Sequence, residues 1–199
     1  MSLTVINYHR RMGRWEPDAR GRLEDAALAL YGERGFEQTT VAEIAKRAGL
    51  AERTFFRYFA DKREVLFWGA DTLQAFLVAK VASAHGTATP IEAIAVALEA
   101  AGALLQERRE HARKRQGVIA ANAGLREREL IKLASLAAAL GNAVRQRGVT
   151  EPAASLAGEA GIAVFKVAVE RWLNDTGQGD LPQFIRESLD DLKAVTAGR

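Results

Sequence analysis

The sequence predicts an all-α fold in which three short helices precede a bundle of longer ones. Three observations support this class. Apolar residues recur at helical spacing along nearly the whole chain. Patterns that cap helices, such as Thr40 with Glu43, stand where helices would begin. No segment of useful length alternates apolar and polar residues as a strand would. Helices of this kind bury their apolar stripes against one another.

The first third of the chain contains the short helices. Over residues 18–34 the apolar residues form one stripe, and Gly35 supplies a left-handed stop. Thr40 begins a capping box, which opens a helix over 41–47. A third helix is expected over 51–59, so that three helices of modest length follow one another.

The remaining helices are longer. Asp61 and Glu64 repeat the capping spacing and open a helix that we expect to continue to residue 84. Thr89, Pro90 and Glu92 form a second strong start signal. The helices expected after residue 89 cover 90–106, 107–122, 126–147, 151–175 and 181–196.

Composition restricts the possible functions. The 199 residues are 48% hydrophobic and 27% charged, as in ordinary globular proteins. There is no cysteine, which excludes disulfides, thiol catalysis and Cys-ligated metals. The net charge of +3 permits an anionic partner without requiring one. The first twenty residues lack the apolar core of a signal peptide, and no run approaches the ~18 apolar residues of a membrane span, so we expect a cytoplasmic protein.

Residues 41–59 have the arrangement of a helix-turn-helix. Two short helices are joined by a turn that contains Gly49, which adopts positive φ at no steric cost. At 100° per residue, Phe55 and Phe59 share the buried side of the second helix. The residues that point away from this side are Arg53, Thr54 and Arg57.

A short cationic face of this kind suits the major groove of DNA, which admits one helix and is read by residues near its N-terminus. Arg53 has the donors to pair with a guanine, and Thr54 suits a base edge or a thymine methyl group. Thr40 and Lys62 begin their helices and are placed for backbone phosphates. A purely structural helix pair is the alternative.

The segment FEQTTVAEIAKRAGLAERTFFRYFADKREVLF, residues 36–67, resembles the DNA-binding domain of TetR-family transcriptional regulators. The resemblance extends over residues 18–68. It is carried by Gly35, Thr40, Ile44, Ala45, Ala48, Gly49, Thr54, Tyr58, Phe59 and Lys62. It implies that bases are faced by Glu52, Arg53, Thr54 and Phe56, and that phosphates are held by Thr40, Tyr58 and Lys62.

Two positions depart from the family pattern. Ala51 stands where Ser or Thr is frequent, so a helix cap worth roughly 1 kcal/mol is lost. Phe56 stands where Tyr is frequent, so we expect readout there to be an apolar contact.

The resemblance divides the chain into a basic arm (1–17), a DNA-binding domain (18–69) and a ligand-binding and dimerisation domain (70–199). In the arm, Arg10, Arg11 and Arg14 are placed to enter the minor groove or follow the backbone, and a solvated tail is the alternative.

The second domain weakly resembles regulators whose ligand domain is likened to acyl-CoA binders. The resemblance implies a small-molecule effector, acyl-CoA-like or otherwise hydrophobic. The candidate pocket residues are Trp68, Phe76, His111, Phe165 and Trp172. For the four aromatic residues the alternative is a place in the core, because large residues on long helices more commonly belong there. For His111, which lies among arginines, the alternative is a solvated face.

Two helices are candidates for a dimer interface. Small residues form a stripe at helical spacing within 151–175: Ala154, Ala157, Gly158 and Gly161. Glycine inside a helix costs about 1 kcal/mol relative to alanine, so the stripe indicates close approach of another helix. That helix belongs either to a second subunit or to the same chain. The last helix offers Phe184, Leu189 and Leu192 for a four-helix interface.

An enzyme is not expected. His9, His85 and His111 are isolated in the sequence, and there is no glycine-rich phosphate loop. No metal or redox cofactor is implied. We expect a homodimeric repressor that binds a near-palindromic operator and is released by a small molecule. The alternatives are a constitutive DNA-binding or architectural protein whose second domain only dimerises, and a helical protein-interaction module.

Overall fold

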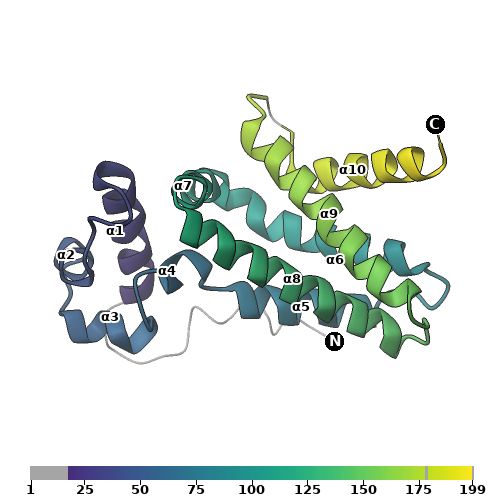
Figure 1. Ribbon diagram of the computed structural model, residues 1–199, viewed down its shortest axis with the longest axis horizontal. Coiled ribbons are helices and arrows are strands. Elements are labelled where there is room, and N and C mark those ends of the chain that lie inside the picture. The colour runs from purple at the N-terminus through teal and green to yellow at the C-terminus, as the bar shows by residue number, and fades with distance from the viewer. Residues whose placement is uncertain (1–17, 178, 199) are drawn as a thin grey trace. The chain divides into compact units, whose positions relative to one another are not determined.

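The computed structural model describes residues 18–177 and 179–198. Over these ranges all regular secondary structure is helical, and the predicted all-α class is confirmed (Figure 1). The chain divides into two compact units, Met1–Leu66 and Phe67–Arg199. The division falls within a short helix, just ahead of the boundary expected after residue 69.

The first unit is a small three-helix domain. Its helices are α1 (Ala19–Arg34), α2 (Val41–Arg47) and α3 (Glu52–Tyr58), followed by α4 (Glu64–Phe67). Leu23, Ile44 and Phe55 are fully buried and form the centre of its core. Burying an apolar side chain at each such position contributes about 1.5–3 kcal/mol to the free energy of folding. This contribution stabilises helices that are too short to persist alone.

The helix predicted from the start of α4 to residue 84 is interrupted. α4 ends at Phe67, and α5 (Ala70–Ala82) begins after Gly69, whose φ of 88° is left-handed. A continuous α-helix needs negative φ at every residue, so the chain must break here. The span Glu64–Ala82 is long and apolar enough, by length and composition, to cross a membrane, which the sequence prediction overlooked. In the structure its residues Leu77 and Val81 are fully buried among other helices.

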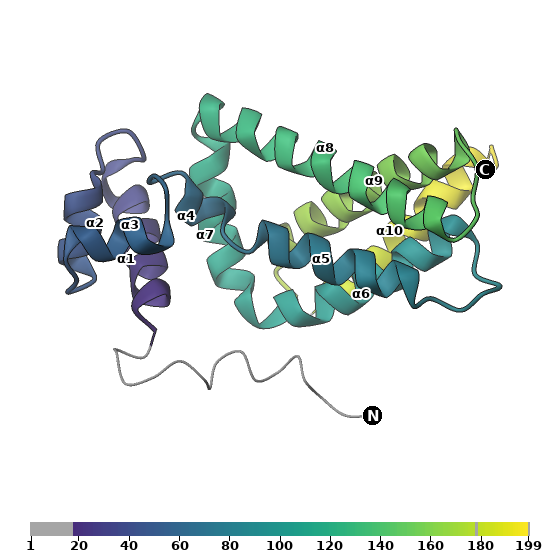
Figure 2. The ribbon, with the colours of Figure 1, turned by 90° about the horizontal axis from the view of Figure 1, so that it is seen from below.

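The second unit is a bundle. It consists of α5, α6 (Pro90–Leu105), the 3-10 helix η2 (Gln106–Arg108), α7 (Arg109–Ala120), α8 (Ala123–Gln146), α9 (Ala153–Asn174) and α10 (Leu181–Thr196). α9 packs against α8, α10 and α6, and α5 lies between α6 and α8 (Figures 1 and 2). The predicted start signal at Thr89 is present as a capping box with Glu92.

The small-residue stripe of α9 contacts helices of the same chain. A Cβ on Gly158 would lie 2.9 Å from the backbone N of Gly141 in α8, and closer still to the carbonyl O of Ala137. A Cβ on Gly161 would lie 2.5 Å from Cγ2 of Ile94 in α6. The intrachain alternative is therefore the one that the structure shows. The predicted dimer residues Ala154, Ala157, Gly158 and Gly161 are all buried in their own bundle.

The residues proposed on α10 are also turned toward the chain's own core. Leu189 is buried, and Phe184 and Leu192 are half-buried against the same core. Phe184 and Leu192 keep part of their surface exposed, so a dimer contact by α10 stays a prediction.

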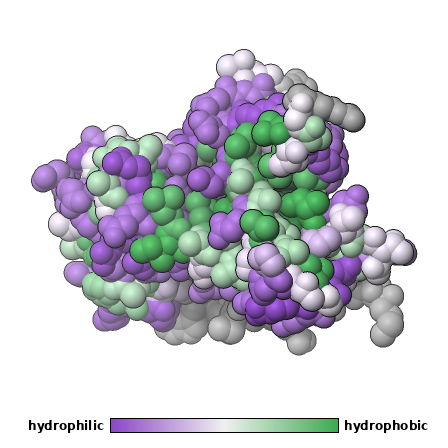
Figure 3. Space-filling model, turned by 45° about the vertical axis from the view of Figure 1, so that its right-hand side comes forward, coloured by the Kyte–Doolittle hydropathy of each residue, from purple (hydrophilic) through white to green (hydrophobic). Residues whose placement is uncertain are grey.

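A different face of α9 is apolar and exposed. Leu156 is 66% exposed and Val167 is 48% exposed, and Ala160 and Ala163 lie between them at helical spacing. Figure 3 shows apolar surface gathered on the side of the second unit that carries α9. The stripe continues without interruption for about three turns.

Candidate DNA-binding site

A tight turn joins α2 to α3. Gly49 has φ 68°, and the backbone N–H of Leu50 donates to the carbonyl of Ala45 at 2.8 Å. Ile44 and Phe55 are fully buried where the two helices meet, and the Phe55 ring is 5.3 Å from the ring of Phe59. The apolar residues therefore fix α3 on α2 in the helix-turn-helix arrangement expected from the sequence.

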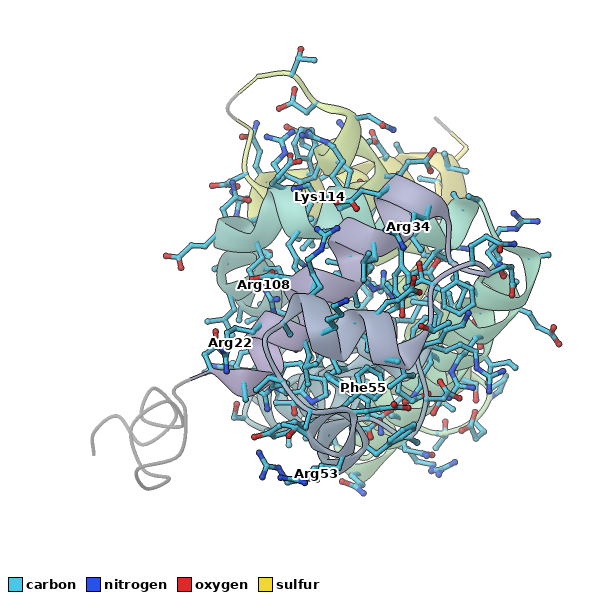
Figure 4. All side chains as sticks on the ribbon, turned by 90° about the vertical axis from the view of Figure 1, so that its left-hand side faces the viewer. Arg22, Arg34, Arg53, Phe55, Arg108 and Lys114 are labelled. Atoms are coloured by element: carbon cyan, nitrogen blue, oxygen red, sulfur yellow. The ribbon has the colours of Figure 1, made fainter. Side chains whose placement is uncertain are left out.

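The outer face of α3 presents the side chains predicted to read bases. Glu52 and Arg53 are exposed, Phe56 is 54% exposed, and Thr54 is half-buried. Figure 4 shows Arg53 projecting outward from the first unit while Phe55 is turned inward. The structure thus brings the four predicted base-facing residues together on one short helix.

Arg57 joins this face and was not among the predicted DNA contacts. Its Nη2 donates to the Tyr58 hydroxyl at 3.0 Å, and its guanidinium lies 4.9 Å from the centre of that ring. Because the Tyr58 oxygen accepts this bond, its own O–H remains available to donate to a phosphate. The signal for Arg57 was its outward position beside Arg53 in the helical pattern.

Thr40 is engaged in the predicted capping box. Its Oγ1 accepts from the backbone N–H of Glu43 at 3.2 Å and donates to the Glu43 carboxylate at 2.9 Å. The backbone N–H of Thr40 donates to the same carboxylate and, as the largest cause, holds the pKa of Glu43 below its usual range. Arg34 pairs with Glu43 at 2.8 Å and brings a further exposed cation beside Thr40. A phosphate contact by Thr40 stays a prediction.

Two ion pairs link α1 to α2. Arg47 donates to both carboxylate oxygens of Glu33, at 3.0 and 2.6 Å, and Arg34 pairs with Glu43 as described above. The hydrogen bond from Arg47 is the largest cause of a lowered pKa of Glu33. Exposed pairs contribute only about 0–1 kcal/mol each, so their main effect is to fix the orientation of α2.

The ammonium group of Lys62 has hydrogen-bond partners that the sequence did not indicate. Its Nζ donates to the backbone carbonyls of Phe36, Glu37 and Thr39 at 2.9, 3.1 and 3.0 Å. An ammonium group has three donors, so none is left for a DNA phosphate in this conformation. In this structure Lys62 holds the segment that precedes α2, and its phosphate contact stays a prediction.

Tyr31 reinforces the same region. Its hydroxyl donates to the carbonyl of Lys62 at 2.6 Å. Burial raises the pKa of this hydroxyl above its usual range, and the charge of Asp61 adds to the effect. The side chain of Tyr31 therefore stays neutral and keeps its donor.

Replacing Lys62 with Ala should lower the free energy of unfolding of the first unit by ~2 kcal/mol, because three carbonyls lose a charged donor. Urea unfolding followed by circular dichroism measures this change. Lys46→Ala, on the exposed side of α2, is the control and should change little. Unchanged stability together with weaker binding to every DNA sequence would show instead that Lys62 holds a phosphate.

The predicted pocket residues do not form one cluster. Trp172, 1% exposed, belongs to the core of the second unit, and Phe76 and Phe165 pack half-buried against that core. Trp68 is 40% exposed. His111 is half-buried, and its Nε2 lies 3.2 Å from Nη2 of Arg108.

Arg10, Arg11 and Arg14 lie outside the described residues. Within the part of the chain that the structure describes, no group of three or more His, Asp or Glu side chains could hold a metal ion.

Two protein-family models match the chain, one in each unit. The model of bacterial regulatory proteins of the tetR family matches residues 23–67, and the model of the MftR C-terminal domain matches residues 88–197. The chain belongs to the TetR family. Membership in the TetR family makes it a transcriptional regulator and not an enzyme, as the sequence predicted.

Curated relatives align over less than half of the chain. A Mycobacterium tuberculosis protein named MftR, for mycofactocin biosynthesis regulation, is 37% identical over 62 residues, 31% of each chain. The regulator TcmR of Streptomyces glaucescens is 38% identical over 82 residues, 41% of this chain and 36% of its own. The matches thus span about a third of the length of these relatives.

Solved structures share the fold of most of the chain. The repressor FadR of Thermus thermophilus, in complex with lauroyl-CoA, is 24% identical, with a TM-score of 0.56 over 87% of this chain and 93% of its own. SmeT, the repressor of the Stenotrophomonas maltophilia multidrug efflux pump SmeDEF, is 19% identical, with a TM-score of 0.57 over 88% and 89%. At these identities the likeness is one of fold.

Proposed function

We propose that this TetR-family regulator is a repressor that binds a near-palindromic operator as a homodimer and is released by a small molecule. The observation that carries the proposal is the outer face of α3, where Arg53, Phe56 and Arg57 are exposed on a helix anchored by fully buried Phe55. A helix with this division of faces fits the major groove.

Each exposed residue has a role that its chemistry suits. Arg53 would pair with a guanine, and Glu52 and Thr54 would contact neighbouring base edges. Phe56 would contact a thymine methyl group or a sugar, because it has no hydroxyl. Tyr58 and Thr40 would contact phosphates, with Arg57 and Arg34 as additional cations beside them.

The exposed stripe of α9 supports the homodimer. Leu156, Ala160, Ala163 and Val167 would pack against the same stripe of a second copy, which a two-fold symmetric contact permits. Two copies of α3 would then enter successive major grooves, about 34 Å apart. Because DNA binding requires this separation, a change in the second unit that alters it would weaken DNA binding.

Relatives in fold suggest the class of effector. FadR was solved in complex with lauroyl-CoA, and SmeT in complex with triclosan. We infer an apolar or acyl-CoA-like effector that lies near Phe76, Phe165 and Trp172, in a cytoplasmic protein. A coupling of ~1–3 kcal/mol between effector and operator would change DNA affinity ~5–150-fold. A constitutive DNA-binding protein would show no such coupling.

Replacing Arg53 with Ala should weaken binding to a selected operator by ~1–3 kcal/mol and relax the base preference at one position. Gel shifts at fixed salt on sites selected from random duplexes measure both effects. Arg126→Ala, an exposed arginine on α8, is the control and should bind as the unsubstituted protein does. Undiminished affinity and selectivity of the Arg53 variant would contradict the groove assignment.

Replacing Leu156 with Glu should convert the dimer to a monomer, because two carboxylates would be buried without a partner and would repel each other across the two-fold axis. Sedimentation at micromolar concentration distinguishes a 21.6 kDa monomer from a dimer. A monomeric unsubstituted protein would contradict the homodimer, and a dimeric Glu variant would contradict the choice of face.

A further inference from the structure

Two buried N–H groups at the end of α9 have no hydrogen-bond acceptor among the described residues. They are Nε1 of Trp172, a residue that is 1% exposed, and Nε of Arg109 on α7. The guanidinium carbon of Arg109 lies 5.7 Å from the centre of the Trp172 ring, so the two donors belong to one place in the bundle.

Arg109 is held firmly by its other nitrogens. Nη2 donates to the backbone carbonyls of Trp172 and Asp175 and lies 3.4 Å from the Asp175 carboxylate. Nη1 reaches the carbonyl of Gly177 at 3.5 Å. The neighbouring Arg113 donates twice to the carbonyl of Leu173, at 3.0 and 2.9 Å. The guanidinium groups of α7 thus satisfy the last carbonyls of α9, and Nε of Arg109 is left over.

Unsatisfied buried donors are costly. Leaving one without a partner costs about 1–3 kcal/mol, so two at one place cost about 2–6 kcal/mol. An acceptor that reached both would recover that cost. Since one donor carries a positive charge, a negatively charged acceptor with two oxygens fits best.

Apolar side chains surround the two donors. Phe165 and Val169 precede Trp172 by seven and three residues, lie on the same face of α9, and are half-buried against the core. α7 covers this end of the bundle, yet only Ile119 of its residues is fully buried. A hydrocarbon chain bound here would lie between α7 and the face of α9 that carries Phe165 and Val169.

We propose that Nε1 of Trp172 and Nε of Arg109 bind the carboxylate of a small molecule whose hydrocarbon part packs against Phe165 and Val169. The proposal rests on the effector-binding role proposed above and gives that effector a chemical class. The small molecule must be a free acid, because the group that accepts from both donors must carry a negative charge.

The test compares three eight-carbon probes on the full-length protein by isothermal titration calorimetry: octanoate, octanoyl-CoA and octylamine. Octanoate should bind more tightly than octylamine, whose ammonium group cannot accept a hydrogen bond. Trp172→Phe keeps the ring and removes the N–H, and should weaken octanoate binding by about tenfold while leaving octylamine unchanged.

A second measurement does not depend on the variant being well folded. The sequence contains three tryptophans, so indole ¹⁵N labelling gives a simple spectrum of the unsubstituted protein. Octanoate should move one indole N–H resonance to the position of a hydrogen-bonded group, and that resonance should be missing from Trp172→Phe.

Three results would overturn the proposal: equal binding of octanoate and octylamine, octanoate binding that Trp172→Phe does not weaken, or a Trp172-dependent preference for octanoyl-CoA, which would assign the donors to a thioester carbonyl. Gel shifts with operator DNA distinguish failure of this binding site from failure of the proposed function. Octanoate that binds through Trp172 but leaves the operator complex intact would support the site and contradict its role in releasing DNA.

Discussion

Replacing Gly158 with Ala is expected to lower the free energy of unfolding of the second unit by ~3 kcal/mol. The added Cβ would lie 2.9 Å from the backbone N of Gly141 and closer still to the carbonyl O of Ala137. Both atoms belong to the backbone of α8, which cannot turn aside as a flexible side chain can. The two helices must separate, and every side chain packed between them loses contact.

Gly117→Ala is the matched control for this prediction. Gly117 lies in α7, and a Cβ there would meet nothing within 4 Å. The same substitution should therefore stabilise the protein by up to about 1 kcal/mol, through helix propensity alone. Urea unfolding followed by circular dichroism should move the two midpoints in opposite directions. A Gly158 variant as stable as the Gly117 variant would show that α8 and α9 do not approach so closely.

Replacing Phe55 with Ala is expected to cost ~3–5 kcal/mol and to abolish operator binding. Phe55 is fully buried, and its ring contacts those of Phe56 and Phe59 at 5.6 and 5.3 Å. Removing it leaves a cavity at the centre of the core of a small unit. α3 would then lose its fixed position on α2, and its outer residues would lose their common orientation.

The neighbouring substitution, Phe56→Ala, separates stability from recognition. Phe56 is 54% exposed, so its removal should change the free energy of unfolding by less than about 1 kcal/mol. It should nevertheless change the base preference at the step that the ring contacts. Thermal unfolding and selection of sites from random duplexes measure the two effects separately. Equal loss of stability in both variants would contradict the division of α3 into a buried and an exposed side.

Most helices could be predicted because their signals are local. Thr40 and Thr89 form the capping boxes that their spacing to Glu43 and Glu92 predicted. The break at Gly69 was missed because an isolated glycine inside an apolar run is equally compatible with an unbroken helix. Only the positive φ of that residue decides between the two.

Contacts between distant residues were harder to predict. The small stripe on α9 indicated a close helix but not which one, and the structure shows α8 and α6 of the same chain. The family pattern placed Lys62 at a phosphate, whereas three carbonyls from the segment 36–39 surround its ammonium group. Sequence spacing does not reveal such a set, because it depends on how a loop folds back over a helix start.

The alternation along α3 has a consequence for how regulators of this kind diverge. Phe55 contributes to folding, and Arg53, Phe56 and Arg57 contribute little to it because they are exposed. In the binding mode proposed above, substitutions at these outer positions after gene duplication would be nearly neutral for folding while altering which promoters the copy occupies. A helix of seven residues can thus give paralogues new targets at little risk to the rest of the molecule.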